Sequence, residues 1–174
     1  MKIITFGDEL LRQKAEKIKD FNEEVANTAK QMLEILKIDK GIGVAGPQIG
    51  FMKRIFVTHV EGDIGRIYIN PSILETSLET AKFEEGCLSV PGIFANVVRS
   101  ESVKIQAWNE KGRPFTLEAS GILARVIQHE YDHLEGVVFL DRVPEKKREK
   151  LIAKYEKNQK SAVKPAGAES KHGA

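Results

Sequence analysis

The chain has 174 residues, of which 41% are hydrophobic and 30% charged, proportions that are typical of a globular protein. No apolar run approaches the roughly 18 residues that a membrane span needs, and the start MKIITFGDEL lacks the basic and then apolar pattern of a secretion signal. With a single cysteine, Cys87, an internal disulfide is excluded, which fits a reducing cytoplasm. Cys87 is therefore a core thiol, a nucleophile or a metal ligand.

The net charge of +2 is too small to indicate nucleic-acid binding by itself, and we expect neither DNA nor a membrane as a partner. Residues 145–174 carry nine Lys/Arg and four Asp/Glu, a balance of +5 on a body that is close to neutral. Such a basic segment could contact an acidic partner such as RNA. A solvated helix face that keeps the protein soluble is the simpler interpretation.

The first predicted helix begins near Asp20 and Glu23, which have the spacing of a capping box, and runs to about Leu36. Its apolar residues recur at helical spacing, so one face should be buried. The glycine-rich segment GIGVAGPQIG (41–50) ends this helix. It lacks the GxGxxG spacing and the following Lys-Ser/Thr of phosphate-binding loops, so the segment does not indicate a phosphate site.

Short segments rich in β-branched and aromatic residues predict strands in the middle of the chain. They are RIFVTHV (54–60), RIYIN (66–70), which should end at Pro71, and KIQAW (104–108). NEKG (109–112) predicts a turn that joins the last of these to PFTLE (114–118) in a hairpin.

Two more helices are predicted in the C-terminal part of the chain. Ser120 can cap a helix over about 121–135, and Pro144 can begin a third helix that is rich in Lys and Glu. Beyond it the sequence has no apolar period, so we expect one domain over 1–160 and a flexible tail over 161–174. Central strands flanked by helices, without strand–helix alternation, predict an α+β fold.

The second of these helices carries QHEYDH (128–133), which combines two histidines with two acidic residues. Advancing by about 100° per residue places His129, His133 and Glu130 within the apolar arc of the helix. The opposite, polar side of the wheel holds Gln128, Asp132 and Arg125. An unpaired carboxylate facing the core costs on the order of several kcal/mol. A buried hydrogen-bonded pair or a cation must therefore accompany Glu130.

His129 and His133 lie four residues apart and can present two imidazoles to one metal ion, with Glu130 beside it. A hydrogen-bonded core pair is the alternative, but His-Glu-x-x-His on a buried helix face favours a metal site. Two imidazoles need a further ligand. One metalloprotease pattern, H-E-x-x-H-x-x-G-x-x-H, is followed as far as Gly136, but Phe139 stands where the last histidine belongs.

Other candidates for the third ligand lie on both sides of this motif. Downstream glutamates are available at Glu145, Glu149 and Glu156, but they fall on a helix that looks solvated. Upstream, Cys87 stands out in EEGCLSVPG (84–92). A thiolate with two imidazoles suits iron(II), zinc, nickel or cobalt, and ligand softness alone does not choose among them.

Three segments now point to one family. GIGVAGPQIG (41–50), EEGCLSVP (84–91) and QHEYDHLEGVVF (128–139) occur in this order and together resemble the three signature motifs of the peptide deformylases. These metal hydrolases remove the formyl group from newly made bacterial proteins. The similarity runs from about Ile4 to Val143. It implies antiparallel sheets packed around a central metal-binding helix with further helices at both ends, a cytoplasmic location, and formylmethionyl nascent peptides as substrates.

Carried over residue by residue, the resemblance makes Cys87, His129 and His133 the ligands of one divalent ion, with water completing the coordination. Such families commonly use Fe(II) and accept Zn, Ni or Co in its place. Glu130 would be the general acid/base that takes the proton of the metal-activated water and passes it to the leaving amine. Glu85, one of the residues before the cysteine, can support the site through an ion pair with Arg99.

The resemblance also makes Gln48 and the backbone N–H of Leu88 the groups that stabilise the oxyanion. Alternatively, Gln48 only ties its loop to a neighbouring backbone group. Gly46 stands where the family more often has alanine, which predicts a looser loop. The strand edge at Gly43 would pair with the substrate backbone. By family correspondence, the apolar pocket for the substrate's methionine is formed by Ile42, Phe83, Ile122 and Val126, any of which could equally be plain core.

Two other functions remain open at this point. One is a conventional HExxH peptidase that cuts internal peptide bonds. The other is a binding protein with a structural metal, for which four protein ligands are expected, and no fourth Cys or His lies near these motifs. If the chain is a deformylase, the basic segment over 145–174 can hold it at the ribosome, where its substrates emerge.

Overall fold

A computed structural model describes residues 1–162 of the chain. Of the tail predicted over 161–174, residues 163–174 lie outside the described part, and the first two belong to the last helix. The elements are η1 (Glu9–Arg12), α1 (Glu23–Asp39), β1 (Gly43–Ala45), η2 (Gly46–Ile49), β2 (Ile55–Thr58), β3 (Arg66–Thr76), β4 (Thr80–Cys87), β5 (Val90–Ser100), β6 (Ser102–Trp108), β7 (Pro114–Ser120), α2 (Gly121–Leu134), η3 (Phe139–Arg142) and α3 (Glu145–Ala162).

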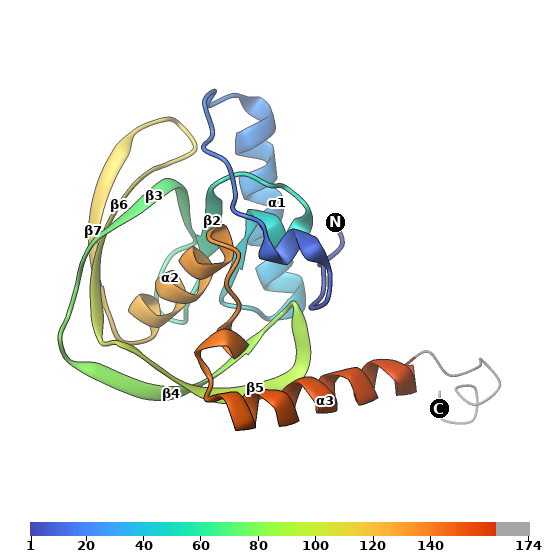
Figure 1. The fold of residues 1–174 in the computed structure, drawn as a ribbon. Helices are drawn as coiled ribbons and strands as arrows, with labels where there is room; N and C mark the ends of the chain where they lie inside the picture. The colour runs from blue at the N-terminus through green and yellow to red at the C-terminus, as the bar shows by residue number, and fades with distance from the viewer. Residues whose placement is uncertain (163–174) are drawn as a thin grey trace.

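Two antiparallel sheets surround one helix. Five strands pair in the order β1-β2-β3-β6-β7, and β4 and β5 form a separate two-stranded sheet. Figure 1 shows α2 in the middle of the molecule, between the curved larger sheet and the β4–β5 hairpin, with α1 and α3 at the outside. The predicted α+β fold, with sheets around a central helix and further helices near both ends, is confirmed. No helix within residues 1–162 is long and apolar enough to cross a bilayer.

Buried apolar side chains form three clusters. One cluster joins α2 to the larger sheet and includes Phe56, Tyr68, Ile105, Ile127 and Leu134. A second lies between α1 and the strands β1 and β2, and a third joins β5 to η3 and α3. Because α2 contacts both sheets, two of its faces are covered, and this burial fixes the direction of its buried side chains.

Two predicted boundaries are wrong. The N-cap of α1 is Asn22, whose side chain accepts a hydrogen bond from the backbone of Val25, and not Asp20. Strand β3 does not end at Pro71 but continues to Thr76. Asn70 has a φ of 48° and the pairing register with β6 shifts at this point, so a bulge accommodates the proline within the strand.

The predicted hairpin over 104–118 is confirmed as β6 and β7, and Asn109 accepts hydrogen bonds from the backbone of Lys111 and Arg113 in its turn. Ser120 occupies the N-cap position of α2, but its side chain makes no capping bond. Pro144 directly precedes α3, as predicted. Sequence analysis missed β4 and β5 altogether, and this hairpin carries Cys87 at its turn.

Candidate metal centre

Cys87, His129 and His133 converge on one point beneath β4. One possible ligand atom from each lies within 4.8 Å of the others, and Cys87 Sγ lies 3.4 Å from His133 Nε2. The cysteine is the last residue of β4, and the histidines occupy successive turns of α2. Cys87 lies 42 residues before His129 and 46 before His133, and the three meet because the hairpin packs against the helix.

The surroundings of the two imidazoles fit a metal ion. Glu85 Oε1 lies 2.9 Å from His129 Nδ1, which leaves Nε2 of that ring free to bind a metal. His133 Nδ1 and Glu130 Oε1 are buried without a hydrogen-bond partner among the described residues. Unpaired buried polar atoms are costly. The Glu130 carboxylate lies beside the cluster, where a metal-bound water could pair with it, and His133 keeps Nε2, on the side of Cys87, free for a metal.

The composition of the cluster indicates the type of site. A thiolate and two imidazoles are a donor set for zinc or ferrous iron. Within residues 1–162 no fourth Cys, His, Asp or Glu joins the three. Because closed structural sites use four protein ligands, a three-residue set that leaves one position open is typical of a catalytic centre.

Glu85 is buried behind the cluster and is held by two arginines. Arg99 donates through Nε to Oε2 at 2.6 Å and through Nη2 to Oε1 at 3.0 Å, and Arg125 Nη1 donates to Oε2 at 2.6 Å. Burial would raise the pKa of Glu85, but the hydrogen bonds from His129 and Arg99 outweigh it and hold this pKa well below its usual value. The expected Glu85–Arg99 pair is present, and its carboxylate stays charged beside His129.

The polar side of the helical wheel does not face solvent. Asp132 is 7% exposed, and it pairs with Arg99 Nη1 at 3.0 Å and with Arg142 Nε at 2.6 Å. Arg125 also lies largely buried against the hairpin. Sequence reasoning assigned these two residues no role, because the wheel cannot show that a second sheet covers that side of α2.

Burial and neighbouring charge shift the protonation of the site residues. Burial raises the pKa of Glu130 to about 7, against the opposing charges of His129 and Arg99. Burial opposes protonation of His129, but the charge of Glu130 and the Cys87 thiol outweigh it and raise the pKa of His129. Burial and the charge of His129 lower the pKa of His133. A carboxyl group with a pKa near neutrality is suited to proton transfer.

Gln48 lies behind the cysteine on the short helix η2. Its Oε1 accepts from the backbone of Ala45 at 2.8 Å, and its Nε2 donates to Ser89 Oγ at 3.1 Å and lies 3.5 Å from Cys87 Sγ. The side chain therefore ties the loop, as the alternative interpretation held, and it also brings an amide N–H to the edge of the cluster. Leu88 follows Cys87 in the turn of the hairpin.

Gly46 does not loosen this loop. The residue is buried, and a Cβ added to it would lie 2.4 Å from the carbonyl oxygen of Phe51 and 2.7 Å from that of Lys53. The close approach of two backbone segments needs the missing side chain, so the expectation of a looser loop is wrong.

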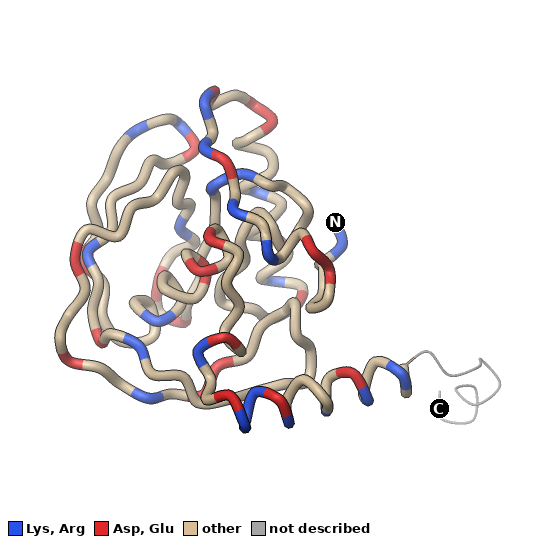
Figure 2. The backbone as a smooth tube through the Cα atoms, in the orientation of Figure 1, with Lys and Arg blue, Asp and Glu red and all other residues tan. Residues whose placement is uncertain are grey.

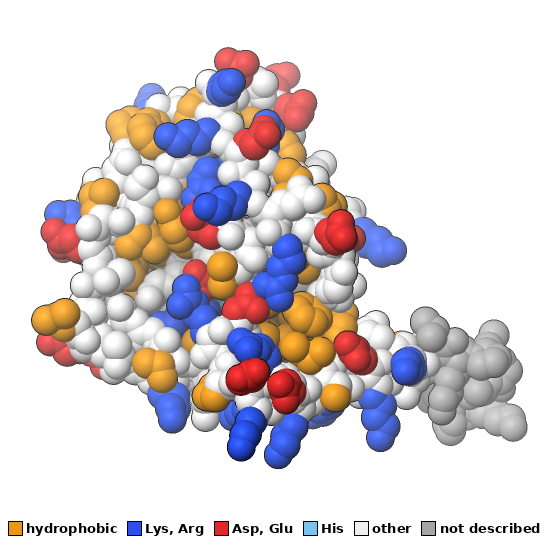
Figure 3. Space-filling view, viewed as in Figure 1, with side chains coloured by type: hydrophobic (Ala, Val, Ile, Leu, Met, Phe, Trp, Pro, Cys, Tyr) orange, Lys and Arg blue, Asp and Glu red, His pale blue; other side chains and the backbone are white. Residues whose placement is uncertain are grey.

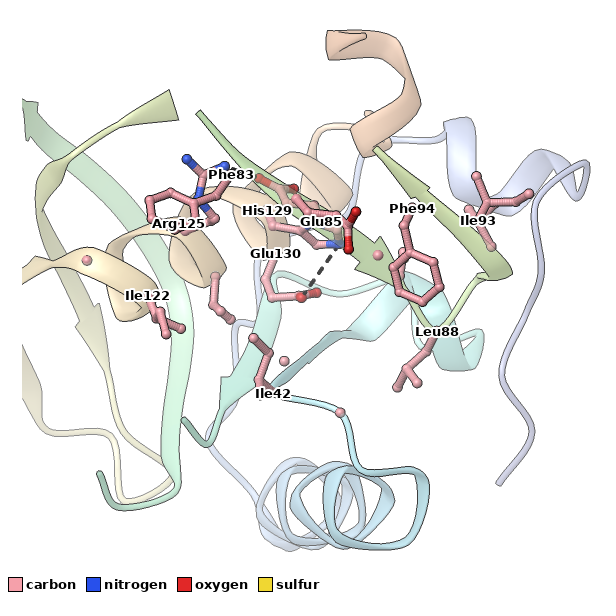
Figure 4. A pocket seen from close by; sticks show the side chains of 18 of the residues that line it. Ile42, Phe83, Glu85, Leu88, Ile93, Phe94, Ile122, Arg125, His129 and Glu130 are labelled. Carbon is pink, nitrogen blue, oxygen red and sulfur yellow. Dashed lines mark hydrogen bonds and ion pairs between the residues drawn. The ribbon is translucent and has the colours of Figure 1, made fainter. Parts of the chain in front are cut away.

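A cavity of about 970 Å³ opens in front of the cluster. Figure 4 shows Glu130 and His129 at its centre, Arg125, Phe83 and Ile122 on one side, and Leu88 and Phe94 on the other. Its lining includes the five residues expected to contact substrate: Ile42, Gly43, Phe83, Ile122 and Val126. Ile42, Phe83 and Ile122 are 46%, 62% and 64% exposed, so these three are not core residues.

Comparisons with known proteins agree on one family. The family model described as polypeptide deformylase matches residues 1–149. A peptide deformylase of Borreliella burgdorferi is 41% identical over 157 residues, which cover 89% of this chain and 94% of that relative. The crystal structure of a peptide deformylase from Legionella pneumophila superposes with a TM-score of 0.88 at 35% identity and covers 94% of this chain and 98% of its own. The structure of a Synechococcus elongatus peptide deformylase in complex with actinonin superposes with a TM-score of 0.85 at 38% identity, covering 88% and 86%.

Proposed function

The chain belongs to the polypeptide deformylase family, and on that premise we propose that Cys87, His129 and His133 hold the divalent ion with which it acts. The protein is a metal-dependent hydrolase that removes the N-terminal formyl group from formylmethionine of newly synthesised polypeptides and releases formate. The observation that carries the proposed ligand set is the convergence of one sulfur and two imidazoles within 4.8 Å. The remaining assignments follow from the surroundings of this cluster.

Fe(II) is the ion that we propose for the cell, with Zn, Ni or Co as replacements. The mixed sulfur and nitrogen donor set supports a borderline-soft divalent ion. When bound, the ion supplies Lewis-acid activation of a water molecule and of the formyl oxygen. Elemental analysis of protein purified without oxygen identifies the ion, and an enzyme equally stable in air and under argon would argue against iron.

Glu130 is the general acid/base in this proposal. Its Oε1 is buried without a partner and its pKa is raised to about 7, so it can accept a proton at neutral pH. Attack of water on the formyl carbon transfers one proton to Glu130. When the bond between the formyl carbon and the amide nitrogen breaks, Glu130 returns that proton to the nitrogen. The products are formate and a free amino terminus.

The negative charge that grows on the formyl oxygen requires hydrogen-bond donors. We assign this role to the Gln48 side chain and to the backbone N–H of Leu88. Gln48 Nε2 lies 3.5 Å from Cys87 Sγ, and its position is fixed from the other side by Ala45. Donors that are already oriented stabilise the transition state without reorganisation.

The substrate binds in the cavity as an added strand. β1 is an edge strand of the larger sheet with β2 as its partner, and its other edge is at the cavity. A Cβ on Gly43 would lie 2.6 Å from Val126 Cγ1 and 2.7 Å from Glu130 Oε2, so this edge strand can lie directly against the acid/base only because the residue is glycine. The methionine side chain occupies the apolar wall formed by Phe83, Ile122 and Val126.

Formate release tests this function directly. The metal-loaded protein should release formate from formyl-Met peptides and leave the internal bonds of unformylated peptides intact. Cleavage of internal bonds without formate release would instead support a conventional HExxH peptidase. A bound metal with four protein ligands and no activity on either substrate would support a structural site.

We also propose that the enzyme occupies the cytoplasm and contacts the ribosome through α3. Figure 2 shows the charges along this helix, and Figure 3 shows basic side chains projecting from the surface there. Residues 145–162 carry seven Lys/Arg and three Glu. The helix is docked by the buried Tyr155, whose hydroxyl donates to Phe6 O at 3.3 Å. We expect residues 1–160 to act as one catalytic domain that includes this helix.

Charge reversal tests the ribosome contact without removing the docked helix. Changing the exposed Lys154, Lys157 and Lys160 to Glu should weaken co-sedimentation with ribosomes and leave turnover of short peptides unchanged. The control reverses three exposed lysines elsewhere, at Lys14, Lys17 and Lys30. Equal co-sedimentation of the two variants would reject the contact.

A further inference from the structure

Arg125 connects α2 to both strands of the β4–β5 hairpin. Its Nη1 donates to Glu85 Oε2 at 2.6 Å and to the carbonyl oxygen of Val97 at 3.0 Å, and its Nη2 donates to that of Ala81 at 2.8 Å. One guanidinium thus holds a carboxylate and two backbone groups on adjacent strands. The fork geometry of arginine allows such multiple contacts, which lysine cannot reproduce.

The same guanidinium lies over the wall of the cavity. Arg125 Cζ is 5.4 Å from the centre of the Phe83 ring, and both residues line the cavity. Figure 4 shows the two side chains together on one side of Glu130. Phe83 is opposite Val97 in the hairpin and is 62% exposed, so few other contacts restrict its ring. Arg125 therefore restrains Phe83 in two ways. It contacts the Phe83 ring, and it binds the backbone of Ala81 on the same strand, β4.

The two arginines on Glu85 differ in their other partners. Arg99 is 5% exposed and continues away from the cavity to Asp132, beneath the metal ligands. Arg125 instead contacts Phe83 in the cavity wall. If Arg125 were removed, Glu85 would still accept two hydrogen bonds from Arg99 and would still hold His129. The support of the metal site and the support of the pocket wall are thus separable.

We propose that Arg125 is a positioning residue for substrate selection, which fixes Phe83 as the wall against which the first side chain of the substrate packs. Arg99, in contrast, holds the Glu85 carboxylate in place against His129. This inference rests on the proposed function, because it presumes that the cavity receives the formylated residue. It adds that Arg125 acts through Phe83 and not through His129.

Steady-state kinetics of Arg125→Leu, Phe83→Leu and the double variant test this role, with formyl-Met and formyl-Ala peptides as substrates. Arg125→Leu should raise KM for formyl-Met and reduce the preference over formyl-Ala by about tenfold, the size expected for one hydrophobic pocket contact. Its kcat and metal content should stay close to those of the wild type. Phe83→Leu should reproduce the loss, and the double variant should lose no more than either single variant, because both act on one wall.

Controls separate the possible outcomes. Arg113→Leu, at an exposed position before β7, should change nothing, and Arg125→Lys should restore part of the preference. Additive effects of the two single variants, or an unchanged preference in Arg125→Leu, would overturn the proposal. So would a loss of metal in Arg125→Leu equal to that in Arg99→Leu. If Arg125→Leu does not fold, Arg125→Lys and its double variant with Phe83→Leu replace it, with a smaller loss of preference expected for Arg125→Lys alone and no loss beyond that of Phe83→Leu in the double variant. A wild-type protein that releases no formate would reject the proposed function itself.

Discussion

Glu85 stands directly behind His129, with 2.9 Å between its Oε1 and the ring nitrogen Nδ1. This contact fixes the proton of the imidazole on Nδ1 and leaves Nε2 as a lone-pair donor. Because Arg99 holds both oxygens of the carboxylate, the orientation of the ring depends on an ion pair that is itself buried. The strand that supplies Glu85 also supplies Cys87, so in the proposed metal site one hairpin both provides a ligand and orients another.

Replacing the charge of Glu85 should destabilise the protein in a pH-dependent way. The pKa of Glu85 is held below its ordinary value of 4.5, so its charge stabilises the fold above pH 4.5 and this contribution is lost as the pH falls. Glu85→Gln leaves Arg99 without this charge, and we expect it to cost about 3–5 kcal/mol at pH 7.

Urea unfolding of the metal-free protein at several pH values measures this cost. The difference between Glu85→Gln and the wild type should shrink as the pH falls below 4.5, because the carboxyl of the unfolded wild-type chain takes up a proton there while the folded one, with its lowered pKa, stays charged. A difference that stays constant from pH 7 to pH 3 would show that the charge of Glu85 contributes nothing.

Removing the sulfur should remove the metal. Cys87→Ala leaves two imidazoles, which are too few to hold a divalent ion firmly. We expect the metal content of the purified variant to fall to a small fraction of the wild-type value, and activity to fall with it. Elemental analysis after dialysis measures the loss, and a variant that keeps one ion per chain would remove Cys87 from the ligand set.

Removing the acid/base should separate metal binding from turnover. Glu130→Ala is expected to keep the ion, because Glu130 is not among the three proposed ligands. Its kcat should fall by about 10²–10⁴, the usual contribution of a positioned proton-transfer group. Paired measurements of metal content and formate release decide the point. An active Glu130→Ala enzyme would contradict the chemistry assigned to this residue.

A side chain at position 46 should be destabilising in this chain. The Cβ of Gly46→Ala would meet two backbone carbonyl oxygens at 2.4 and 2.7 Å, neither of which can move alone. We expect a loss of about 1–3 kcal/mol in the free energy of unfolding. In the control, Gly65→Ala, the nearest atom is 3.1 Å away and belongs to the side chain of Leu33. Equal stability of the two variants would show that the loop adapts.

The sequence predicted the residues of the candidate metal centre better than the hairpin and the ion pairs that hold them in place. His129, Glu130 and His133 follow from helical periodicity, because burial of a charged group on an apolar face requires a partner. Cys87 follows from being the chain's one thiol and from its motif. Neither argument places the thiol beside the histidines, since that depends on a hairpin that was not predicted.

The hairpin was missed because Pro91 and Gly92 stand at the second and third positions of β5, and both residue types disfavour a strand. Its later residues alternate between buried and exposed positions, and Arg99 occupies one of the buried positions. A buried arginine looks like a surface residue in a sequence, and the same is true of Asp132 on α2. Buried ion pairs between distant segments carry no periodic signal, so Arg125 and Arg142 could not be assigned either.

X-ray absorption at the metal edge of the loaded wild-type protein tests the central claim most directly. With zinc, the account predicts one sulfur at about 2.3 Å and two imidazole nitrogens at about 2.0–2.1 Å, with an oxygen donor at the open position. The sulfur contribution should be absent from any residual metal in Cys87→Ala. A wild-type spectrum without sulfur, or one with a fourth protein ligand in place of solvent, would contradict the account.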